Sequence, residues 1–496
     1  MSDFIISIDQ GTTSSRAVLF SAEGNILVIA QTEFPQYFPE QGWVEHDPIE
    51  ILNSTYAVMD DIFNCDELKN GRVVGIGITN QRETSVVWDK KTGIPIYNAI
   101  VWQDKRTTGV CEELKNRGLD EYTKLTTGLL IDPYFSGTKV AWILDHVDGA
   151  RERAIKGELC FGTIDSWLLY NLTNKEVHAT DFSNASRTMM FDITSLKWDE
   201  KMLSFLRVPI EILPKVFPSS CVFGHYKSID FGEIPIASIM GDQQSALFGQ
   251  GCFTAGSAKN TYGTGCFMLM NTGTEIPSST SGLLNTIAWQ INGVTTYALE
   301  GSVFIAGSAL QWLRDGLSIL EDVELSSEIA ERESSLNPDS SVIVVPYFAG
   351  IGSPYWDMYA RGAIYGLTRD SGRESIIRAT LESLAFQSQD VLQAMQEDSG
   401  ISIFKLQVDG GASANDYLMQ FQANILGVEV ERPVNLESTA AGVAYMAAIT
   451  LGYLTIDDIS NLNQAEELFK PSKSIEWRMR KTKIWNDAVK RTVTNL

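Results

Sequence analysis

The chain has 496 residues, of which 44% are hydrophobic, so it can bury more than one core and we expect two large domains. Its formal net charge of -23, from 62 acidic and 39 basic residues, argues against nucleic acid or an anionic membrane as a partner. No apolar run approaches the roughly 18 residues of a membrane helix, and no signal-like segment opens the chain, which predicts a cytoplasmic protein without membrane insertion. The six cysteines are scattered without a C-x-x-C pair and are predicted to be buried, reduced thiols: Cys65, Cys111, Cys160, Cys221, Cys252 and Cys266.

The first part of the chain begins with three strand-like runs, 4–9, 14–21 and 26–32, which predict an antiparallel meander. From about residue 48, helical and strand patterns alternate. The predicted helices lie at 48–63, 104–117 and 137–147, and the predicted strands at 73–78 and 84–88. This alternation predicts a layered α/β fold.

A second meander is predicted late in the chain, from strand-like runs at 256–270, 283–291 and 295–301. Before it, a strand at 234–240 leads into a helix at 245–249, and a domain boundary is predicted near 251–256. After it come a helix at 373–399, a strand at 404–408, a glycine-rich turn, a helix at 415–426 and an amphipathic tail helix with Trp477, Ile484, Trp485 and Ala488 on its packed side. The chain therefore starts a similar fold twice.

The turn between the first two strands reads Asp9-Gln-Gly-Thr-Thr-Ser-Ser-Arg16. Gly11 lets the backbone approach an anion, the amides of Thr12 to Ser14 can point at phosphate oxygens, and Asp9 sits where Mg²⁺ could be held. Taken alone, the segment favours the simpler interpretation of a hairpin turn capped by Asp9.

Three more turns follow predicted strands: 241–244 (Gly-Asp-Gln-Gln), 261–265 (Thr-Tyr-Gly-Thr-Gly) and 409–412 (Asp-Gly-Gly-Ala). Together with the first turn they place two acids and three glycine-rich turns at strand ends in two similar domains. This suits a phosphoryl donor held in the cleft between the domains. Asp9 suits the metal and Asp242 the group that orients or deprotonates an attacking hydroxyl, although Asp242 serves equally well as a helix N-cap.

Five polar residues at 80–84 (Asn-Gln-Arg-Glu-Thr) separate two apolar runs. Arg82 and Glu83 offer hydrogen-bond donors and a carboxylate acceptor side by side, as recognition of neighbouring hydroxyls on a small polyol requires. The alternative is a charged surface turn with an ion pair. Trp102, Tyr134 and Phe267 are interpreted either as walls around a ligand or as core aromatics.

With these residues assembled, the sequence resembles the glycerol kinases over nearly its whole length. These enzymes belong to the carbohydrate kinase family, which shares the fold of actin, hexokinase and the Hsp70 ATPase. The motifs that carry the resemblance are 9–16, 80–84 and the segment from Tyr134 to His146, which agrees with the first signature of the wider family. The second signature, at 362–382, fits except at Ser375.

The resemblance implies an α/β fold of two actin-like (ribonuclease H-like) domains, each a mixed β-sheet flanked by helices, with the active site in the interdomain cleft. Residues 1–252 would bind glycerol and phosphate, and residues 253–496 the adenine nucleotide. The implied reaction is ATP-dependent phosphorylation of glycerol to sn-glycerol 3-phosphate and ADP by Mg²⁺-assisted in-line transfer, in glycerol catabolism.

The resemblance also implies site residues, which are carried over by position. Glycerol would contact Arg82, Glu83, Trp102, Tyr134, Asp242, Gln243 and Phe267, with Asp242 as the base. Phosphates of ATP would contact Thr12, Thr13, Ser14, Arg16, Thr264, Gly307 and Gln311, the adenosine side would contact Gly411 and Asn415, and Asp9 would serve Mg²⁺.

Two other functions stay open. A related sugar kinase would act on a pentulose or gluconate, and a non-enzymatic, actin-like ATP switch would need no phosphate acceptor. The resemblance also implies a homodimer or homotetramer, and the loop 224–232 departs from the regulatory patterns known in the family.

Overall fold

The computed structural model describes residues 2–357, 359–434, 437–462 and 465–494. These residues form two compact units. The first consists of Met1–Gly251, Asn285–Tyr297 and Glu437–Leu462, and the second of Cys252–Leu284, Ala298–Leu436 and Asn463–Leu496. The units are interleaved in sequence, whereas the predicted domains, 1–252 and 253–496, are continuous, and that assignment stays a prediction.

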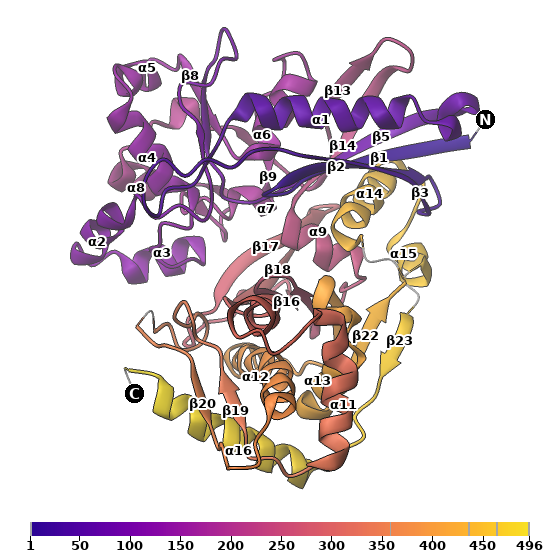
Figure 1. Cartoon of the computed structure of the whole chain (residues 1–496). Coiled ribbons are helices and arrows are strands. Elements are labelled where there is room, and N and C mark those ends of the chain that lie inside the picture. Colours follow the sequence, from indigo (N-terminus) through magenta and orange to yellow (C-terminus); the bar gives the residue numbers. More distant parts are fainter. Residues whose placement is uncertain (1, 358, 435–436, 463–464, 495–496) are drawn as a thin grey trace. The chain divides into compact units, whose positions relative to one another are not determined.

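The first unit is built on a six-stranded mixed sheet with the order β13-β14-β5-β1-β2-β3 (Figure 1). β1 pairs antiparallel with β2 and parallel with β5, and β5 pairs parallel with β14. The strands are β1 (Ser2–Gln10), β2 (Ser14–Ser21), β3 (Ile26–Glu33), β5 (Gly71–Asn80), β13 (Ser220–Ser228) and β14 (Gly232–Gly241). The predicted meander and the predicted strands at 73–78 and 234–240 are confirmed.

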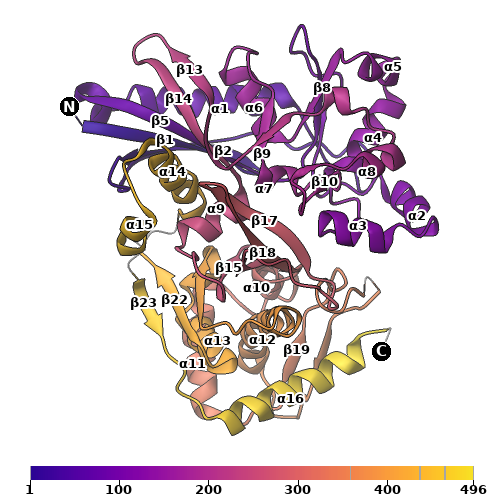
Figure 2. The ribbon, with the colours of Figure 1, turned by 180° about the vertical axis from the view of Figure 1, so that it is seen from behind.

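Helices cover both faces of this sheet. α1 (Pro48–Phe63) packs against β2 and β3, and α14 (Ser438–Leu451) packs against β1, β5 and β14 on the opposite face (Figures 1 and 2). α1 starts where predicted because the Asp47 carboxylate accepts a hydrogen bond from the Ile49 amide at 2.7 Å and Pro48 suits the first helical position. Gly77 is required opposite α14, since a Cβ there would lie 2.6 Å from the Val443 carbonyl oxygen.

The remainder of the first unit consists of short strands and helices, most of which lie between residues 80 and 220. The helices are α2 (Thr108–Asn116), α3 (Asp120–Thr127), α4 (Ser136–His146), α5 (Ala150–Ile155), α6 (Ile164–Leu172), α7 (Phe182–Ala185), α8 (Glu200–Leu206), α9 (Asp242–Gly249) and α15 (Ile456–Leu462). The paired strands are β4 (Glu45–His46) with β7 (Ala99–Ile100), β6 (Val86–Asp89) with β8 (Leu159–Gly162), β9 (Ala179–Asp181) with β12 (Lys215–Phe217), and β10 (Phe191–Asp192) with β11 (Lys197–Trp198).

The seven-stranded sheet, most of which belongs to the second unit, repeats a five-strand pattern of the six-stranded sheet. Its order is β17-β18-β16-β15-β21-β22-β23, and the segment β16-β15-β21-β22-β23 has the same succession of antiparallel, parallel, parallel and antiparallel pairs as β2-β1-β5-β14-β13. The strands are β15 (Ser257–Tyr262), β16 (Cys266–Gly273), β17 (Leu284–Ile291), β18 (Val294–Val303), β21 (Lys405–Asp409), β22 (Glu429–Pro433) and β23 (Ala465–Phe469), with β19 (Ile343–Val345) and β20 (Ala363–Tyr365) as a separate pair.

The sequence prediction was wrong in one strand of this sheet. The run 256–270 is not one strand but a hairpin of β15 and β16, because the turn at 263–265 reverses the chain and pairs Tyr262 with Cys266. With that correction, the predicted duplication and the mixed sheets flanked by helices agree with the structure.

The helices of the second unit are α10 (Gly307–Gln311), α11 (Ser326–Leu336), α12 (Arg373–Ser399), α13 (Asp416–Leu426) and α16 (Ile475–Thr492). The predicted helix 373–399 is confirmed as α12. α16 packs against α13 and β19 (Figure 2), with Trp485 and Ala488 buried, whereas Ile484 is 37% exposed and lies outside the packed side that was predicted for it.

Two sequence-level expectations concern the whole chain. In the part of the chain that the structure describes, no helix is both long enough and apolar enough to cross a membrane. All six cysteines are free, but Cys65 and Cys221 are half-buried, so the prediction of buried thiols holds for the other four.

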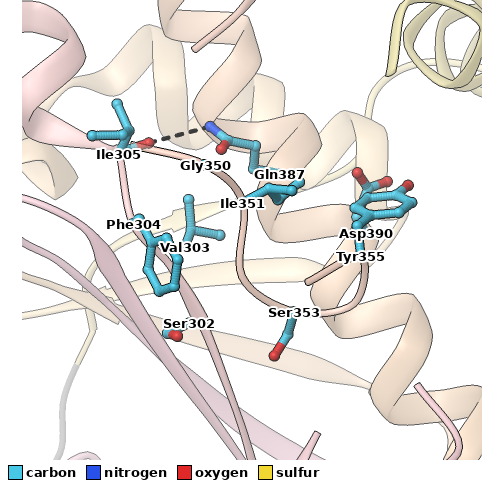
Figure 3. Close-up of a pocket in the computed structure, with 10 residues that line it drawn as sticks. All are labelled: Ser302, Val303, Phe304, Ile305, Gly350, Ile351, Ser353, Tyr355, Gln387 and Asp390. Carbon is cyan, nitrogen blue, oxygen red and sulfur yellow. Dashed lines mark hydrogen bonds between the residues drawn. The ribbon is translucent and has the colours of Figure 1, made fainter. Parts of the chain in front are cut away.

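A small pocket in the second unit, with room for about one water molecule, lies between the end of β18, the segment 350–355 and α12 (Figure 3). Asp390 of α12 lines it beside Tyr355 and accepts a hydrogen bond from Trp485 Nε1 of α16 at 2.8 Å. Burial raises the pKa of Asp390 to about 7, although the hydrogen bonds from Trp485 and Tyr355 lower it in part. Because burial outweighs these hydrogen bonds, the folded state is more stable with this carboxyl protonated than with it ionised.

We predict that Asp390→Asn stabilises the protein at alkaline pH. The folded state holds the Asp390 proton between about pH 4 and pH 7, so its contribution to stability is lost as pH rises through that range. At pH 8 the ionised carboxylate costs on the order of 4 kcal/mol relative to a neutral group of the same shape. Melting temperatures measured from pH 4 to pH 8 should be closest between the two proteins at the acid end and should increasingly favour the variant as pH rises to 8. A constant difference across this range would contradict the assignment.

Candidate functional site

Three neighbouring parallel strands of the first unit end at the same edge of the sheet. The register pairs Gln10 of β1 with Asn80 of β5, and Asn80 with Gly241 of β14. Because carboxyl ends of adjacent parallel strands meet, the opening turn, the block 80–84 and the start of α9 lie together. The candidate site residues of the first unit come from these three strand ends and from two nearby segments.

Arg82 is the centre of this group. It is 3% exposed, and its guanidinium lies 3.1 Å from Asp242 Oδ1 through Nε, 3.4 Å from the Tyr134 hydroxyl through NH2 and 3.4 Å from Gln244 Oε1 through NH1. The whole block 80–84 is buried, which rules out a charged surface turn. A buried cation of this kind aims planar donors at neighbouring oxygens.

Glu83 has a backbone φ of 59°, in the left-handed region that a non-glycine residue rarely adopts. Its carboxylate accepts a hydrogen bond from Arg187 Nε at 2.7 Å, and its carbonyl oxygen accepts one from Ser136 Oγ at 3.0 Å. Arg187 is fully buried and its guanidinium lies 5.7 Å from the centre of the Tyr134 ring. Arg187 was not predicted as a site residue from the sequence. The one clue in the sequence was that this arginine is the single charged residue in the segment 182–191.

Asp242 is the first residue of α9 and is half-buried. The helix begins three residues earlier than predicted, and its N-cap is Gly241, so the alternative role of Asp242 as the N-cap is wrong. The contacts of its carboxylate with Arg82 Nε and with the Gln243 amide at 2.7 Å both use Oδ1. Within the described ranges the other oxygen has no such contact, so it can accept a proton or a hydrogen bond from a ligand. Gln243 follows in the same helical turn.

Two aromatic side chains stand beside this polar group. The rings of Trp102 and Tyr134 meet edge to face at 5.6 Å, and Trp102 Nε1 donates to Thr12 Oγ1 at 3.0 Å. Both are half-buried, so neither is a fully enclosed core residue. Phe267, predicted with them, is half-buried on β16 and belongs to the second unit.

The opening turn is a tight hairpin in which the Gly11 amide donates to the Ser14 carbonyl oxygen at 2.9 Å. Thr13 at its tip is exposed, and the Ser14 hydroxyl accepts from Gln31 Nε2 at 3.2 Å. Arg16 donates to Gln31 Oε1 at 2.8 Å and forms an ion pair with Glu437. Glu437, from just before α14, was not predicted, because no local motif marks it.

Burial raises the pKa of Asp9 to about 7, with Arg16 lowering it and the charges of Asp242 and Glu437 raising it further. Among the described residues, none forms a hydrogen bond or an ion pair with the Asp9 carboxylate. A nearby cation would stabilise the ionised form of this half-buried carboxyl group. Mg²⁺ is commonly bound by one or two carboxylates together with phosphate oxygens. The donor set therefore fits the predicted metal.

In the second unit, two glycine-containing turns follow the parallel strands β15 and β21, whose register pairs Thr261 with Asp409. Thr264 is exposed in the first turn, and α10 starts against it because the Gly307 amide donates to the Gly263 carbonyl oxygen at 3.0 Å. A Cβ on Gly307 would lie 2.7 Å from that oxygen, so glycine is required there. Gln311 is exposed at the end of α10.

The second turn contains two glycines with different constraints. Gly410 has a φ of 84°, and a Cβ on it would lie 2.4 Å from the Tyr262 carbonyl oxygen, whereas a Cβ on Gly411 would meet nothing within 4 Å. Asn415 is the N-cap of α13, since its Oδ1 accepts from the Leu418 amide at 2.9 Å, and its Nδ2 donates to Ser326 Oγ at 3.0 Å. The fold thus needs Gly410 and Asn415 but leaves open space beside Gly411.

The structure thus divides the predicted residues between the two units. The first unit brings together Asp9, Thr12, Arg16, Arg82, Glu83, Trp102, Tyr134, Asp242 and Gln243, with Thr13 and Ser14 in the same hairpin turn. The second unit holds Phe267, Thr264, Gly307, Gln311, Gly411 and Asn415.

Comparison with known proteins gives a consistent result. Residues 4–249 match the N-terminal domain, and residues 258–451 the C-terminal domain, of the FGGY family of carbohydrate kinases. The glycerol kinase of Thermus thermophilus is 56% identical over 493 residues, which cover 99% of each chain.

Solved structures agree. A crystal structure of Plasmodium falciparum glycerol kinase with ADP is similar with a TM-score of 0.95 at 37% identity, over 100% of this chain and 99% of that one. A ligand-bound xylulose kinase from Lactobacillus acidophilus shares the fold, with a TM-score of 0.87 at 21% identity over 98% of this chain and 97% of its own. The predicted fold class of two actin-like domains is confirmed.

Proposed function

The chain belongs to the FGGY family of carbohydrate kinases, and we propose that it transfers the γ-phosphoryl group of ATP to a terminal hydroxyl of glycerol. The products are sn-glycerol 3-phosphate and ADP, and the reaction serves glycerol catabolism. Relatives named glycerol kinase match the chain at 54 to 56% identity over nearly its full length. The observation that carries the proposal is the buried Arg82 guanidinium with Asp242 at 3.1 Å and the Tyr134 hydroxyl at 3.4 Å.

The polar group of the first unit has the donors and acceptors that a neutral triol needs. Arg82 donates, the Glu83 and Asp242 carboxylates accept, and the Tyr134 hydroxyl and the Gln243 amide can do both. The Trp102 ring, together with Phe267 of the second unit, is assigned to the carbon side of glycerol. The two buried arginines of this group are already paired with carboxylates, Arg82 with Asp242 and Arg187 with Glu83, so neither is left to balance the charge of an acidic substrate such as gluconate.

The chemical step is a direct, in-line transfer. The terminal hydroxyl oxygen attacks the γ-phosphorus, the bond from that phosphorus to the β–γ bridging oxygen breaks, and ADP leaves with the electron pair. The hydroxyl proton passes to Asp242, through the carboxylate oxygen that Arg82 and the Gln243 amide do not use. Arg82 keeps the other oxygen of that carboxylate in place.

ATP is the phosphoryl donor, in agreement with the ADP-bound relative of known structure. We assign the phosphates to Thr12, Thr13, Ser14 and Arg16 in the first unit and to Thr264, Gly307 and Gln311 in the second. Gly411 and the neighbourhood of Asn415 are assigned to the adenosine side. Asp9 would hold Mg²⁺, which when bound neutralises charge on the β- and γ-phosphates.

Two further assignments complete the proposal. We place the enzyme in the cytoplasm, where ATP is available and where its six free cysteines would stay reduced. We also propose a homodimer or homotetramer, which sedimentation of the purified protein would distinguish from a monomer.

The substrate assignment is tested with four acceptors. ADP formation by the purified protein with Mg-ATP should be fastest with glycerol and slower with dihydroxyacetone, xylulose and gluconate, because the donors and acceptors around Arg82 suit the hydroxyls of a small neutral triol. If xylulose or gluconate were the best acceptor, the enzyme would be a related sugar kinase. ADP release that no acceptor stimulates would instead indicate an ATP switch.

Replacing the proposed base tests the mechanism. Asp242→Asn keeps the shape and the contact with Arg82 but cannot take a proton, so kcat should fall by about 100- to 10,000-fold. Binding of ATP, measured by calorimetry, should be retained because the residues assigned to the nucleotide are others. A variant that kept a tenth or more of the wild-type kcat would exclude Asp242 as the base.

Glycine substitutions test the nucleotide assignment in the second unit. Gly411→Val should leave the melting temperature nearly unchanged, because its Cβ meets nothing, and should weaken ATP binding by about tenfold or more. Gly410→Val is the matched control, which should lower the melting temperature because of its positive φ and its contact with Tyr262. If Gly411→Val bound ATP as tightly as the wild type, the adenosine side would lie elsewhere.

A further inference from the structure

Lys139 of α4 is fully buried, and its ammonium group contacts backbone only. Nζ donates to the carbonyl oxygens of Pro133 at 2.7 Å, Tyr134 at 2.5 Å and Phe135 at 3.3 Å. An ammonium has three donors, so all of them are used on three successive carbonyls of one short segment. Among the described residues, no carboxylate lies within ion-pair distance of this nitrogen.

The position is unfavourable for a cation, so helix stability does not explain it. Lys139 is the fourth residue of α4, near the end of the helix where the dipole repels positive charge. Burial lowers the pKa of Lys139 to about 7, with the more distant charges of Glu83 and Asp104 opposing that shift. Burying this ammonium group therefore costs free energy of folding. Its three hydrogen bonds to the backbone offset that cost.

The segment that Lys139 holds carries the Tyr134 side chain. The backbone from 133 to 135 runs directly into α4, and its last residue, Phe135, is an N-cap without a side-chain hydrogen bond. On the next residue, Ser136 Oγ donates to the Glu83 carbonyl oxygen at 3.0 Å. Movement of this segment would displace the Tyr134 hydroxyl, which accepts a hydrogen bond from Arg82. It would also displace the Ser136 hydroxyl, which holds the Glu83 backbone in place.

We infer that Lys139 is a positioning residue for the polyol, because its ammonium group sets the backbone of 133–135 and thereby the place of the Tyr134 hydroxyl beside Arg82. This inference rests on the proposed function, since it assigns Tyr134 to substrate binding. Lys139 itself does not touch the reacting atoms. Its effect should be felt in glycerol binding and not in the nucleotide.

Two substitutions of graded donor capacity test the inference. Lys139→Met keeps an unbranched side chain, shorter by one atom, but removes all three donors, whereas Lys139→Gln keeps two donors. In Lys139→Met, kcat/KM for glycerol should fall by about 10- to 100-fold, mostly through KM, with Lys139→Gln between it and the wild type. KM for ATP should stay within about twofold of the wild-type value in both.

The matched control is Lys481→Met in α16 of the second unit. Lys481 is also buried, at 4% exposure, and burial lowers its pKa, but none of the predicted site residues is assigned to its helix. Removing it should leave KM for glycerol within about twofold of the wild type. Comparison of the two variants therefore separates the general effect of removing a buried lysine from the specific effect of removing the hydrogen bonds to residues 133–135.

Hydrogen exchange gives a readout that needs no activity. Peptides covering 131–140 should take up deuterium faster in Lys139→Met than in the wild type without substrate, and at the wild-type rate in Lys481→Met. If Lys139→Met does not fold, the kinetic and hydrogen-exchange measurements on Lys139→Gln test the inference in its place.

The inference is overturned if KM for glycerol is unchanged in a folded Lys139 variant, if KM for ATP rises equally, or if exchange in 131–140 is unaltered. A wild-type protein that does not phosphorylate glycerol refutes the proposed function instead. In that case the exchange experiment still decides whether Lys139 holds this segment.

Discussion

The arrangement of the first unit depends on the parallel register of β1, β5 and β14. These strands end side by side, so the residues that follow each one are brought within contact distance although the sequence separates them by some 230 positions from first to last. A shift of one residue in any of these pairings would turn the side chains of that strand to the other face of the sheet. Asp9, Arg82 and Asp242 can act together only because this register holds.

A second constraint follows from the burial of charge at that edge. Arg82, Arg187 and Lys139 are all at most 3% exposed, and each would be costly without partners. The structure satisfies the two arginines with carboxylates, Asp242 and Glu83, and the lysine with three backbone carbonyls. The polar centre is consequently a connected network in which each charged group holds the next one in place, as tight recognition of a small neutral ligand requires.

The sequence revealed those parts of the fold and site that local patterns encode. The hairpin at 9–16, the polar block at 80–84 and the helix 373–399 were predicted because strand alternation, turn residues and helical periodicity are all local. Arg187 and Glu437 were missed because their partners lie 104 and 421 residues away in sequence. The hairpin at 257–273 was predicted as one strand because its turn is only three residues long, so that the turn recognised at 261–265 was not taken to reverse the chain.

The two units repeat one strand pattern but place different chemistry at the equivalent ends. In the first unit charged side chains stand at or just after the ends of β1, β5 and β14, namely Asp9, Arg82 and Asp242, whereas in the second the turns after β15 and β21 carry glycines that let other groups approach the backbone. Charged side chains suit a small acceptor that must be oriented and deprotonated, and open backbone suits a large ligand that is held through its phosphates and ring faces. The duplicated fold is therefore compatible with the proposed division, in which the first unit orients glycerol and supplies the base, and the second unit holds the adenosine side of the nucleotide.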